Sequence, residues 1–372
     1  MKITKLESIF VEPRWNFLKM YTDEGIIGYG EPIVEGRART VAMAVKELEG
    51  YLIGQDPRRI EHHWQTIYRG AFYRGGAVLT SALSGVEQAM WDILGKSLGV
   101  PVYTLLGGAV RDRIRVYGHI GGETTEDLIK SAKEKMALGF TALKTGFDGP
   151  IRIIDTCEFV ENCIERIDAL RKVVPKNIDI AIDCHGRFSP AMAIRVARGL
   201  EPYGILFLEE PCLPENVDTM VTIARSTTIP IATGERLFTK WGFREVLEKQ
   251  AAAVLQPDIC HCGGILEAKK IAAMAECYYV AIAPHNPLGP ISLAAGIQVD
   301  ACIPNFLCQE QVSLGEGYIK EPFKVVNGYI ELPTKPGLGI ELDEEALKSK
   351  INDGSWDTPR WFHKDDGSFA EW

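Results

Sequence analysis

The sequence predicts an α/β protein, a (β/α)7β TIM-like barrel with an N-terminal α+β capping domain. Three observations lead to this prediction. The chain has 372 residues, which leaves room for a barrel of roughly 250 residues and a second domain. Its first part has the pattern of antiparallel strands followed by helices. After Arg115, short β-branched runs alternate with longer amphipathic segments, and such alternation is typical of parallel strands joined by helical crossovers.

Residues 1–115 are predicted to form the capping domain. Residues 17–21 and 26–31 are apolar runs on either side of a Thr-Asp-Glu-Gly turn, which is a hairpin signal. Thr40 is predicted to cap a helix that follows this hairpin. A longer helix is predicted over residues 80–98, because apolar side chains recur there at helical spacing and a glycine follows.

The barrel is predicted over residues 116–325, and it contains eight candidate strands. They are residues 116–120, 142–145, 178–182, 205–208, 229–233, 253–256, 280–283 and 305–308. Helical segments separate most of them, and eight such strands favour closure into a barrel. Residues 326–372 break this alternation with turn residues, and we expect them to leave the barrel and return to the capping domain.

Composition and charge exclude several classes of protein. Hydrophobic residues are 46% and charged residues 24% of the chain, as in an ordinary globular protein. The formal net charge is −9 and the sequence has no basic run, so we expect no nucleic-acid or anionic-membrane partner. No stretch approaches the roughly 18 apolar residues of a membrane span. The nine cysteines and the lack of a signal-peptide pattern near residue 1 lead us to expect reduced thiols and a cytoplasmic protein.

Ionisable residues recur at the ends of six consecutive predicted strands, at intervals of 23 to 27 residues. They are Asp183, Glu209, Glu235, Asp258, His285 and Glu310. One βα unit has about this length, so the six side chains should share one rim of the barrel, where the active sites of such barrels lie. A single acid at a strand end would more often be a helix cap or part of an ion pair. Six in register favour a functional site.

Three of these carboxylates point to a metal ion. Asp183, Glu209 and Glu235 end adjacent strands, which lie about 4.8 Å apart, so their charges would repel one another. A hard divalent cation removes that repulsion, and an all-oxygen ligand set favours Mg²⁺, with Mn²⁺ as the alternative. Glu209 and Glu210 are adjacent in the sequence and should point to opposite faces. Alternation alone does not say which of the two is the ligand.

Two histidines are predicted to flank a substrate held at the metal. His185 follows Asp183 by two residues, so both side chains face the same way if the extended conformation continues. His285 ends the seventh strand, on the opposite wall of a closed barrel. Asp258, on the neighbouring strand, can hold one imidazole nitrogen of His285 and leave the other free as an acid or base.

The other histidines are interpreted differently. We expect surface or packing roles for His62, His63, His119 and His363. His261 follows the sixth strand and stays open between the two interpretations. The Cys260-His261-Cys262 segment could suggest zinc, but the sequence lacks a second pair of ligands at finger spacing.

Several longer motifs resemble the enolase superfamily, in its mandelate-racemase-like branch. They are MKITKLESI, SALSGVEQAMWDILGKSLGVPVYTLLGG, DCHGRFSPAMA, FLEEP, GERLF, LQPDICHCGGI, APHNPLGPISLAA and NGYIELPTKPGLGIEL. The resemblance covers nearly the whole chain, and the set DxHGR, EEP, GER and APHxPLGP is highly specific. It implies an α+β cap over a (β/α)7β barrel. It also implies Mg²⁺-dependent dehydration of a small-molecule sugar acid, and we expect a homo-oligomer.

The resemblance also implies roles for individual residues. The metal ligands would be Asp183, Glu209 and Glu235, the last two as the first Glu of EEP and the Glu of GER. His285, paired with Asp258, would remove the proton beside the substrate carboxylate, and His185 would protonate the departing 3-hydroxyl. Glu310 would hydrogen-bond the substrate carboxylate or the intermediate. The cap segment Arg14, Trp15 and Asn16 would contribute to substrate specificity.

The end of the second strand departs from the family pattern. Racemase-type members have Lys-x-Lys there and the sugar-acid dehydratases resemble Lys-x-Asn, whereas this chain has Lys144 and Gly146. Lys144 could form an internal ion pair in the metal site or contact the substrate. Three alternatives to the predicted activity stay open: dehydration of another acid sugar, racemisation or epimerisation of an acid sugar, and a non-catalytic relative.

Overall fold

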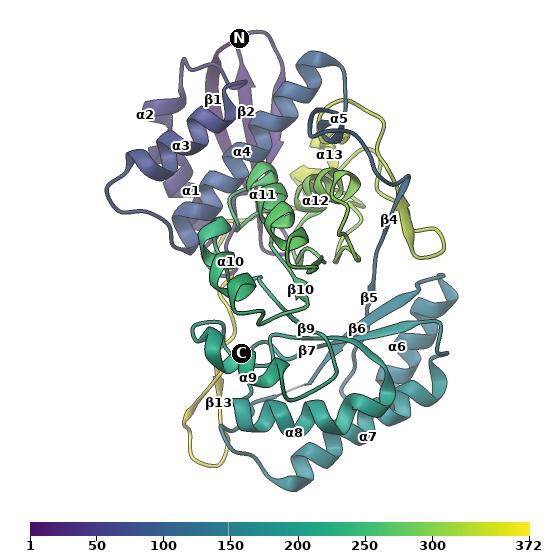
Figure 1. The fold of residues 1–372 in the computed structure, drawn as a ribbon. Coiled ribbons are helices and arrows are strands. Elements are labelled where there is room, and N and C mark those ends of the chain that lie inside the picture. The colour runs from purple at the N-terminus through teal and green to yellow at the C-terminus, as the bar shows by residue number, and fades with distance from the viewer. Residues whose placement is uncertain (148) are drawn as a thin grey trace.

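The computed structural model describes residues 1–147 and 149–372. Its N-terminal part, the cap, is a three-stranded antiparallel sheet in the order β1-β2-β3, covered by helices (Figure 1). The strands are β1 Ile3–Val11, β2 Trp15–Thr22 and β3 Ile27–Gly30, and the helices are α1 Ala38–Glu47, α2 Glu49–Leu52, α3 Ile60–Gly70, α4 Ala77–Leu98 and α5 Val102–Leu105. The pairing of β2 with β3 confirms the predicted hairpin.

The two predicted cap helices form, and both begin a few residues earlier than expected. Helix α4 spans the predicted 80–98 segment and ends at Gly99, which has the left-handed φ of +70°. The prediction that Thr40 caps the first helix is wrong. Helix α1 begins at Ala38, because its buried stripe already begins with Ala38 and continues through Val41. Packing of that stripe against α4 and the sheet therefore sets the start of the helix.

In the described residues of the barrel region, seven parallel strands alternate with seven α-helices. The strands are β5 Gly118–His119, β6 Ala142–Gly146, β7 Asp179–Asp183, β8 Ile205–Glu209, β9 Ile231–Thr233, β10 Val254–Leu255 and β11 Ala281–Ile282, paired in that order. The helices are α6 Thr125–Ala137, α7 Cys157–Val173, α8 Pro190–Leu200, α9 Val217–Ala224, α10 Thr239–Glu248, α11 Ile265–Glu276 and α12 Pro290–Cys302, with a 3₁₀ turn at Glu201–Tyr203.

The eighth predicted strand, residues 305–308, closes the barrel without forming a regular strand. Phe306 forms a parallel bridge with Ile282 of β11, and Gln309 forms one with Val116, just before β5. The backbone N–H of Leu307 donates to the carbonyl of Ile282 over 2.7 Å. One segment thus joins the two edges of the seven-stranded sheet, which gives the (β/α)7β ring that the sequence predicts.

A separate core fills the inside of the ring. It takes one buried residue from each of the eight barrel segments: Tyr117, Ala142, Ala181, Phe207, Ala232, Val254, Ala283 and Cys308. Four of the eight are alanines, and Phe207 and Tyr117 supply the bulk. Because side chains alternate along a strand, this layer fixes which residues of each strand point into the barrel.

The C-terminal segment, expected over residues 326–372 to return to the cap, contacts both parts of the molecule. Strand β12 Tyr329–Glu331 pairs with β4 Arg113–Arg115, and helix α13 Glu344–Lys348 follows. A final hairpin of β13 Trp361–Phe362 and β14 Phe369–Ala370 lies on the barrel side of the molecule, away from the cap sheet, where the yellow segment ends in Figure 1. In the described residues, the structure has no helix that is both long and apolar enough to cross a membrane.

Candidate active site

The strand-end residues lie directly above the interior layer of the barrel. Six rim residues, not all of them among the six predicted from the sequence, follow an interior residue of the same segment by two positions. Their side chains therefore point to the same side of the sheet as that interior residue. These six are His119, Lys144, Asp183, Glu209, His285 and Glu310. One register thus gathers charged groups at the carboxyl ends of the strands, which is the rim that carries active sites in such barrels.

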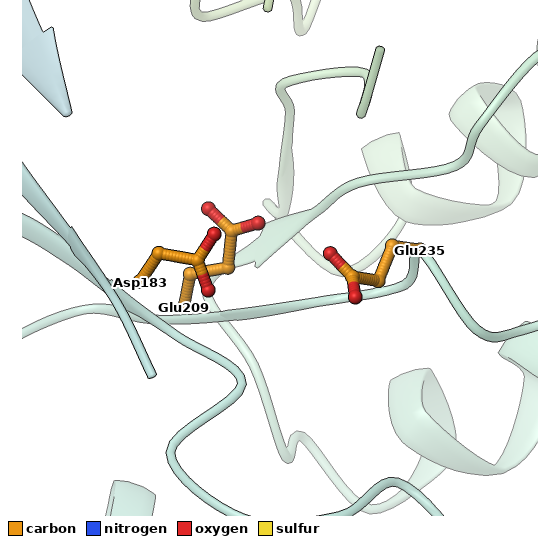
Figure 2. A group of neighbouring side chains, drawn as sticks. All are labelled: Asp183, Glu209 and Glu235. Atoms are coloured by element: carbon orange, nitrogen blue, oxygen red, sulfur yellow. The ribbon is translucent and has the colours of Figure 1, made fainter. Parts of the chain in front are cut away.

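Three carboxylates meet at this rim, as the sequence predicts. One oxygen from each of Asp183, Glu209 and Glu235 lies within 4.8 Å of the others. Asp183 and Glu209 are register neighbours on β7 and β8, and Glu235 follows β9 by two residues and turns back toward them (Figure 2). Three oxygen donors from three adjacent strands fit a hard divalent cation.

Glu210, the second Glu of the EEP motif, points elsewhere. It accepts a hydrogen bond from Arg236 Nε over 2.7 Å, and it has a positive φ of +36°. Phe207 belongs to the interior layer, so alternation places Glu209 inside and sends Glu210 outward. The sequence left open which of the two glutamates faces the other candidate metal ligands. The inward packing of Phe207 selects Glu209.

Lys144 neutralises part of the negative charge at the rim. Its ammonium lies 2.9 Å from Asp183 Oδ2, 2.7 Å from Glu209 Oε2 and 3.1 Å from Glu310 Oε1. Burial tends to raise the pKa of Asp183, but Lys144 and His185 outweigh it and hold that pKa well below its usual range. Burial and the charge of Asp183 raise the pKa of Glu209 well above its usual range. One ammonium therefore faces three carboxylates, with Glu235 close by as a fourth, and a divalent cation would offset the remaining negative charge.

His285 and Asp258 form a hydrogen-bonded pair beside the three carboxylates. His285 Nδ1 lies 2.8 Å from Asp258 Oδ2, and the backbone N–H of Cys260 donates to Asp258 Oδ1 over 2.7 Å. The other ring nitrogen, Nε2, lies 3.3 Å from Glu235 Oε2. Burial lowers the pKa of His285, but the carboxylates of Glu235, Glu310 and Asp258 outweigh it and raise that pKa well above its usual range.

His185 reaches the site through a turn rather than through an extended strand. Its φ is +51° and the strand ends at Asp183, so the condition for the same-side argument, a continued extended conformation, is not met. The backbone N–H of His185 donates to Asp183 Oδ1 over 3.0 Å, and its Nε2 lies 3.3 Å from Asp183 Oδ2. The charge of Asp183 raises the pKa of His185 despite partial burial. A histidine with a raised pKa can hold a proton for delivery.

Glu310 is engaged by protein groups on both of its oxygens. The backbone N–H of Asn286 donates to Oε2 over 2.8 Å, and Lys144 and His119 lie 3.1 and 2.9 Å from Oε1. The prediction that His119 has only a surface or packing role is therefore wrong. His119 follows the interior residue Tyr117 by two positions, and this register is the signal by which it could have been found.

Two adjoining cavities open above the carboxylates, of about 400 and about 350 Å³. Both are lined by His185, His285, Pro287 and Trp372. Glu235 lines the larger cavity, and Asp183, Lys144 and Glu310 line the smaller one. The two histidines thus face the same space, next to the candidate metal ligands.

The predicted cap segment splits between the cavity and the core. Arg14 lines the larger cavity, pairs with Glu35, and donates to the carbonyl of Pro287 over 3.4 Å. Trp15 and Asn16 do not contact the cavity, because they begin strand β2 and are buried in the cap, 4% and 0% exposed. Their expected contribution to specificity is corrected to a role in cap packing.

Two buried carboxylates of the cap hold the loops that carry the histidine–aspartate pair. Glu31 accepts hydrogen bonds from the backbone N–H groups of Gly289 and Ser292, at the start of α12. Glu87 accepts from those of Ile265 and Leu266, at the start of α11. Burial raises the pKa of each of these two glutamates to about 8. Neither helix has a side-chain N-cap of its own, so these two glutamates of the capping domain accept the hydrogen bonds that an N-cap side chain usually accepts.

Gly146 has a steric reason to be glycine. It ends β6 beside Asp183, and a Cβ at this position would lie 2.9 Å from the Asp183 carbonyl oxygen. The glycine also lines the smaller cavity. Its absent side chain leaves the backbone of a candidate metal ligand undisturbed.

The Cys260-His261-Cys262 segment does not join a metal-binding group in the described part of the chain. Both cysteines are buried and unpaired, and Gln88 donates to Cys260 Sγ over 3.3 Å. His261 lies 2.9 Å from the hydroxyl of Ser81 and borders the larger cavity. The zinc interpretation therefore has no support in this geometry.

Comparison with known proteins gives consistent matches over the whole chain. Residues 127–346 match the family described as enolase C-terminal domain-like, and residues 10–107 match the mandelate racemase / muconate lactonizing enzyme N-terminal domain. D-galactonate dehydratases from Ralstonia nicotianae and Xanthomonas euvesicatoria are each 48% identical to this chain, covering all of both sequences.

Solved structures agree with this assignment. A mandelate racemase/muconate lactonizing enzyme from Sulfitobacter superposes with a TM-score of 0.92 at 34% identity, over 99% of this chain and 100% of that one. A member of the enolase superfamily from Salmonella Typhimurium has a TM-score of 0.86 at 33% identity, over 93% and 97% of the two chains.

Proposed function

This chain belongs to the enolase superfamily, in its mandelate racemase and muconate lactonizing enzyme branch, and we propose that it is a hydro-lyase that converts D-galactonate to 2-dehydro-3-deoxy-D-galactonate. Full-length relatives named D-galactonate dehydratase support the substrate. The observation that carries the reaction class is the pair of histidines, His185 and His285, facing one cavity beside three clustered carboxylates.

Asp183, Glu209 and Glu235 are proposed to hold Mg²⁺. The fit is supported by their all-oxygen donor set within 4.8 Å and by the single ammonium of Lys144 that Asp183, Glu209 and Glu310 share. The cation would stabilise the negative charge that develops on the substrate carboxylate when the weakly acidic C2 proton is removed.

His285 is proposed as the base that takes the C2 proton. Asp258 accepts a hydrogen bond from Nδ1 over 2.8 Å, so this pairing keeps the proton on Nδ1 and leaves the lone pair of Nε2 toward the cavity. The pKa of His285 is raised by neighbouring carboxylates, Glu235 among them. A cation bound to Glu235 would offset the charge that raises this pKa. More of His285 would then be unprotonated at Nε2 and able to act as the base.

His185 is proposed as the acid that completes the elimination. The C3–O bond breaks with its electron pair on the oxygen, and His185 donates a proton so that water leaves. The electrons of the former C2–H bond form the C2=C3 double bond, and the resulting enol becomes the 2-keto-3-deoxy acid by taking a proton at C3. A base and an acid on different walls of one site suit departure of the hydroxyl from the face opposite the removed proton.

The remaining polar groups are proposed to position these parts. Lys144 acts as an internal ion-pair partner, since it contacts three carboxylates. Glu310 orients His119 and the loop of Asn286, and it remains close enough to the smaller cavity to contact the substrate carboxylate. Arg14 is the one residue of the predicted cap segment that we retain as a substrate contact.

We further propose the division into a cap at 1–115, a barrel at 116–325 and a C-terminal segment at 326–372. A cytoplasmic location is supported by nine unpaired cysteines, seven of them buried. A homo-oligomer is supported by aromatic side chains left in solvent on the cap, Phe72 at 91% and Tyr73 at 84% exposure.

A screen of acid sugars with Mg²⁺ tests the proposed function. D-galactonate should give a 2-keto-3-deoxy acid, and its kcat/KM should exceed those of D-gluconate and D-mannonate. Exchange of the C2 proton in D₂O without keto-acid formation would instead identify a racemase or epimerase. A tenfold or larger preference for another acid sugar would refute the substrate assignment and leave the reaction class standing.

A further inference from the structure

The C-terminal hairpin brings an aromatic wall to the cavity. Trp372 lines both the larger and the smaller cavity, and its ring centroid lies 6.0 Å from that of His185. Trp361, on strand β13, lines the smaller cavity, and Thr358 lines the larger one. These three residues lie far from the strand-end residues in the sequence, yet they border the same space.

This segment is fixed to both parts of the molecule. On the cap side, Arg39 pairs with Asp353 over 2.5 Å and Arg37 pairs with Asp357 over 3.0 Å. On the barrel side, Arg152 pairs with Asp365 over 2.6 Å. The guanidinium of Arg187, in the DCHGR motif, stacks 5.5 Å from the ring centre of Trp361. These contacts to the cap and to the barrel fix the position of the C-terminal segment beside the two cavities.

Resting on the proposed function, we propose that Trp372 is a specificity-determining residue that contacts the C4–C6 end of the bound sugar acid. The carboxylate, C2 and C3 of the substrate are assigned to the metal ligands, His285 and His185. C4 is bonded to C3, so the distal chain begins beside His185. Trp372 is the aromatic side chain next to His185 on the cavity wall.

The chemistry of an indole suits this end of the substrate. The face of an aromatic ring carries partial negative charge, so it attracts the C–H side of a polyol chain and disfavours its hydroxyl side. The configuration at C4 decides which side the chain presents. D-galactonate and D-gluconate differ only at C4, so a wall at this place discriminates between them.

The test compares D-galactonate with a shortened substrate. L-Threonate keeps the configuration of D-galactonate at C2 and C3 and lacks C5 and C6. For Trp372→Ala we expect kcat/KM to fall tenfold or more with D-galactonate and less than threefold with L-threonate. Where turnover of L-threonate is too slow to follow, its inhibition constant serves as the readout. In Trp372→Ala, the ratio of kcat/KM for D-galactonate to kcat/KM for D-gluconate should fall at least fivefold. Trp372→Phe should keep most of the original ratio.

The matched control is Phe369→Ala, in the same hairpin, whose side chain is 69% exposed. It should leave the kinetic constants of all three acids within twofold. Equal losses on D-galactonate and L-threonate, or no loss on either, would overturn the assignment of Trp372. Absence of any dehydration by the unsubstituted protein would instead refute the proposed function, so the two failures are distinguishable.

Discussion

Replacing Asp258 by asparagine tests the proposed base most directly. Asp258 is fully buried. Its Oδ1 accepts from the backbone N–H of Cys260 over 2.7 Å and its Oδ2 faces His285 Nδ1 at 2.8 Å. In Asp258→Asn the N–H of Cys260 still requires an acceptor, so the new amide oxygen should stay on that side. The amide NH₂ then faces Nδ1 and forces the imidazole proton onto Nε2, the nitrogen that must accept the C2 proton.

The expected loss follows from two known magnitudes. A hydrogen bond to a charged group contributes about 1.5–3 kcal/mol, or roughly 10- to 150-fold. General base catalysis as a whole contributes about 10²- to 10⁴-fold. Because the substitution both removes the charged partner of His285 and favours the wrong tautomer, kcat should fall by about 10²- to 10⁴-fold. Binding of Mg²⁺ should change little, since Asp258 is not among the three clustered carboxylates.

The assay measures keto-acid formation and C2 proton exchange in D₂O, and both should fall together. The pH profile gives an independent readout. Burial lowers the pKa of His285, while Glu235, Glu310 and Asp258 raise it. Since a base acts when deprotonated, activity rises with pH through this pKa. Removing the charge of Asp258 lowers the pKa, so the rise in residual activity should move to lower pH.

The control variant is Asp179→Asn, at the opposite end of a barrel strand, where Asp179 pairs with Arg115 over 2.7 Å. It should keep kcat and the pH profile. A loss of less than threefold in Asp258→Asn, or movement of its activity rise to higher pH, would refute the assignment of the Asp258–His285 pair as the base.

Three further predictions concern the metal, the two histidines and Gly146. Chelation should abolish turnover and Mg²⁺ should restore it, and full turnover of metal-free protein would contradict this. Asp183→Asn should lower kcat by more than about 100-fold, because a bound cation stabilises the transition state by several kcal/mol. His285→Asn should lose both C2 proton exchange and dehydration. His185→Asn should keep part of the exchange and should still eliminate fluoride from a 3-fluoro analogue of the substrate. Loss of that fluoride elimination in folded, metal-binding protein would speak against His185 as the acid. Gly146→Ala should place a Cβ 2.9 Å from the Asp183 carbonyl oxygen, which should lower the free energy of unfolding by about 1–3 kcal/mol and raise the Mg²⁺ concentration needed for half-activation. An unchanged melting temperature and unchanged Mg²⁺ activation would count against the steric explanation.

Residues that follow the strand period could be found from the sequence. Glu209 and His285 are predicted at the rim because each ends an apolar run of strand length, and in the structure each follows an interior residue by two positions. The same register would have identified His119 from Tyr117. A histidine without a partner at motif spacing is typical of the surface, but the register with Tyr117 outweighs that pattern here.

Other parts of the site depend on contacts between distant segments, which no local pattern contains. Trp15 and Asn16 stand beside Arg14 in the sequence, yet strand β2 turns them into the cap and leaves Arg14 at the cavity. The turn residues before Trp372 indicate an end to the helix–strand alternation, but not that the chain then crosses to the barrel mouth. The positive φ of His185 likewise occurs between two backbone hydrogen bonds to another segment, from Cys184 to the carbonyl of Glu209 and from Gly186 to that of Glu210.

The two cap glutamates explain why the site needs both parts of the molecule. The helices that follow the Asp258 and His285 loops have Gly264 and Gly289 as their N-cap residues. A Cβ at Gly264 would lie 2.2 Å from Glu87 Oε2, and one at Gly289 would lie 2.6 Å from Glu31 Oε1. Each barrel glycine thus leaves the space that a cap carboxylate occupies, and each carboxylate satisfies N–H groups that would otherwise be buried without acceptors. The contact between cap and barrel and the placement of the base therefore depend on each other, because the same hydrogen bonds join the cap to the loops that carry Asp258 and His285.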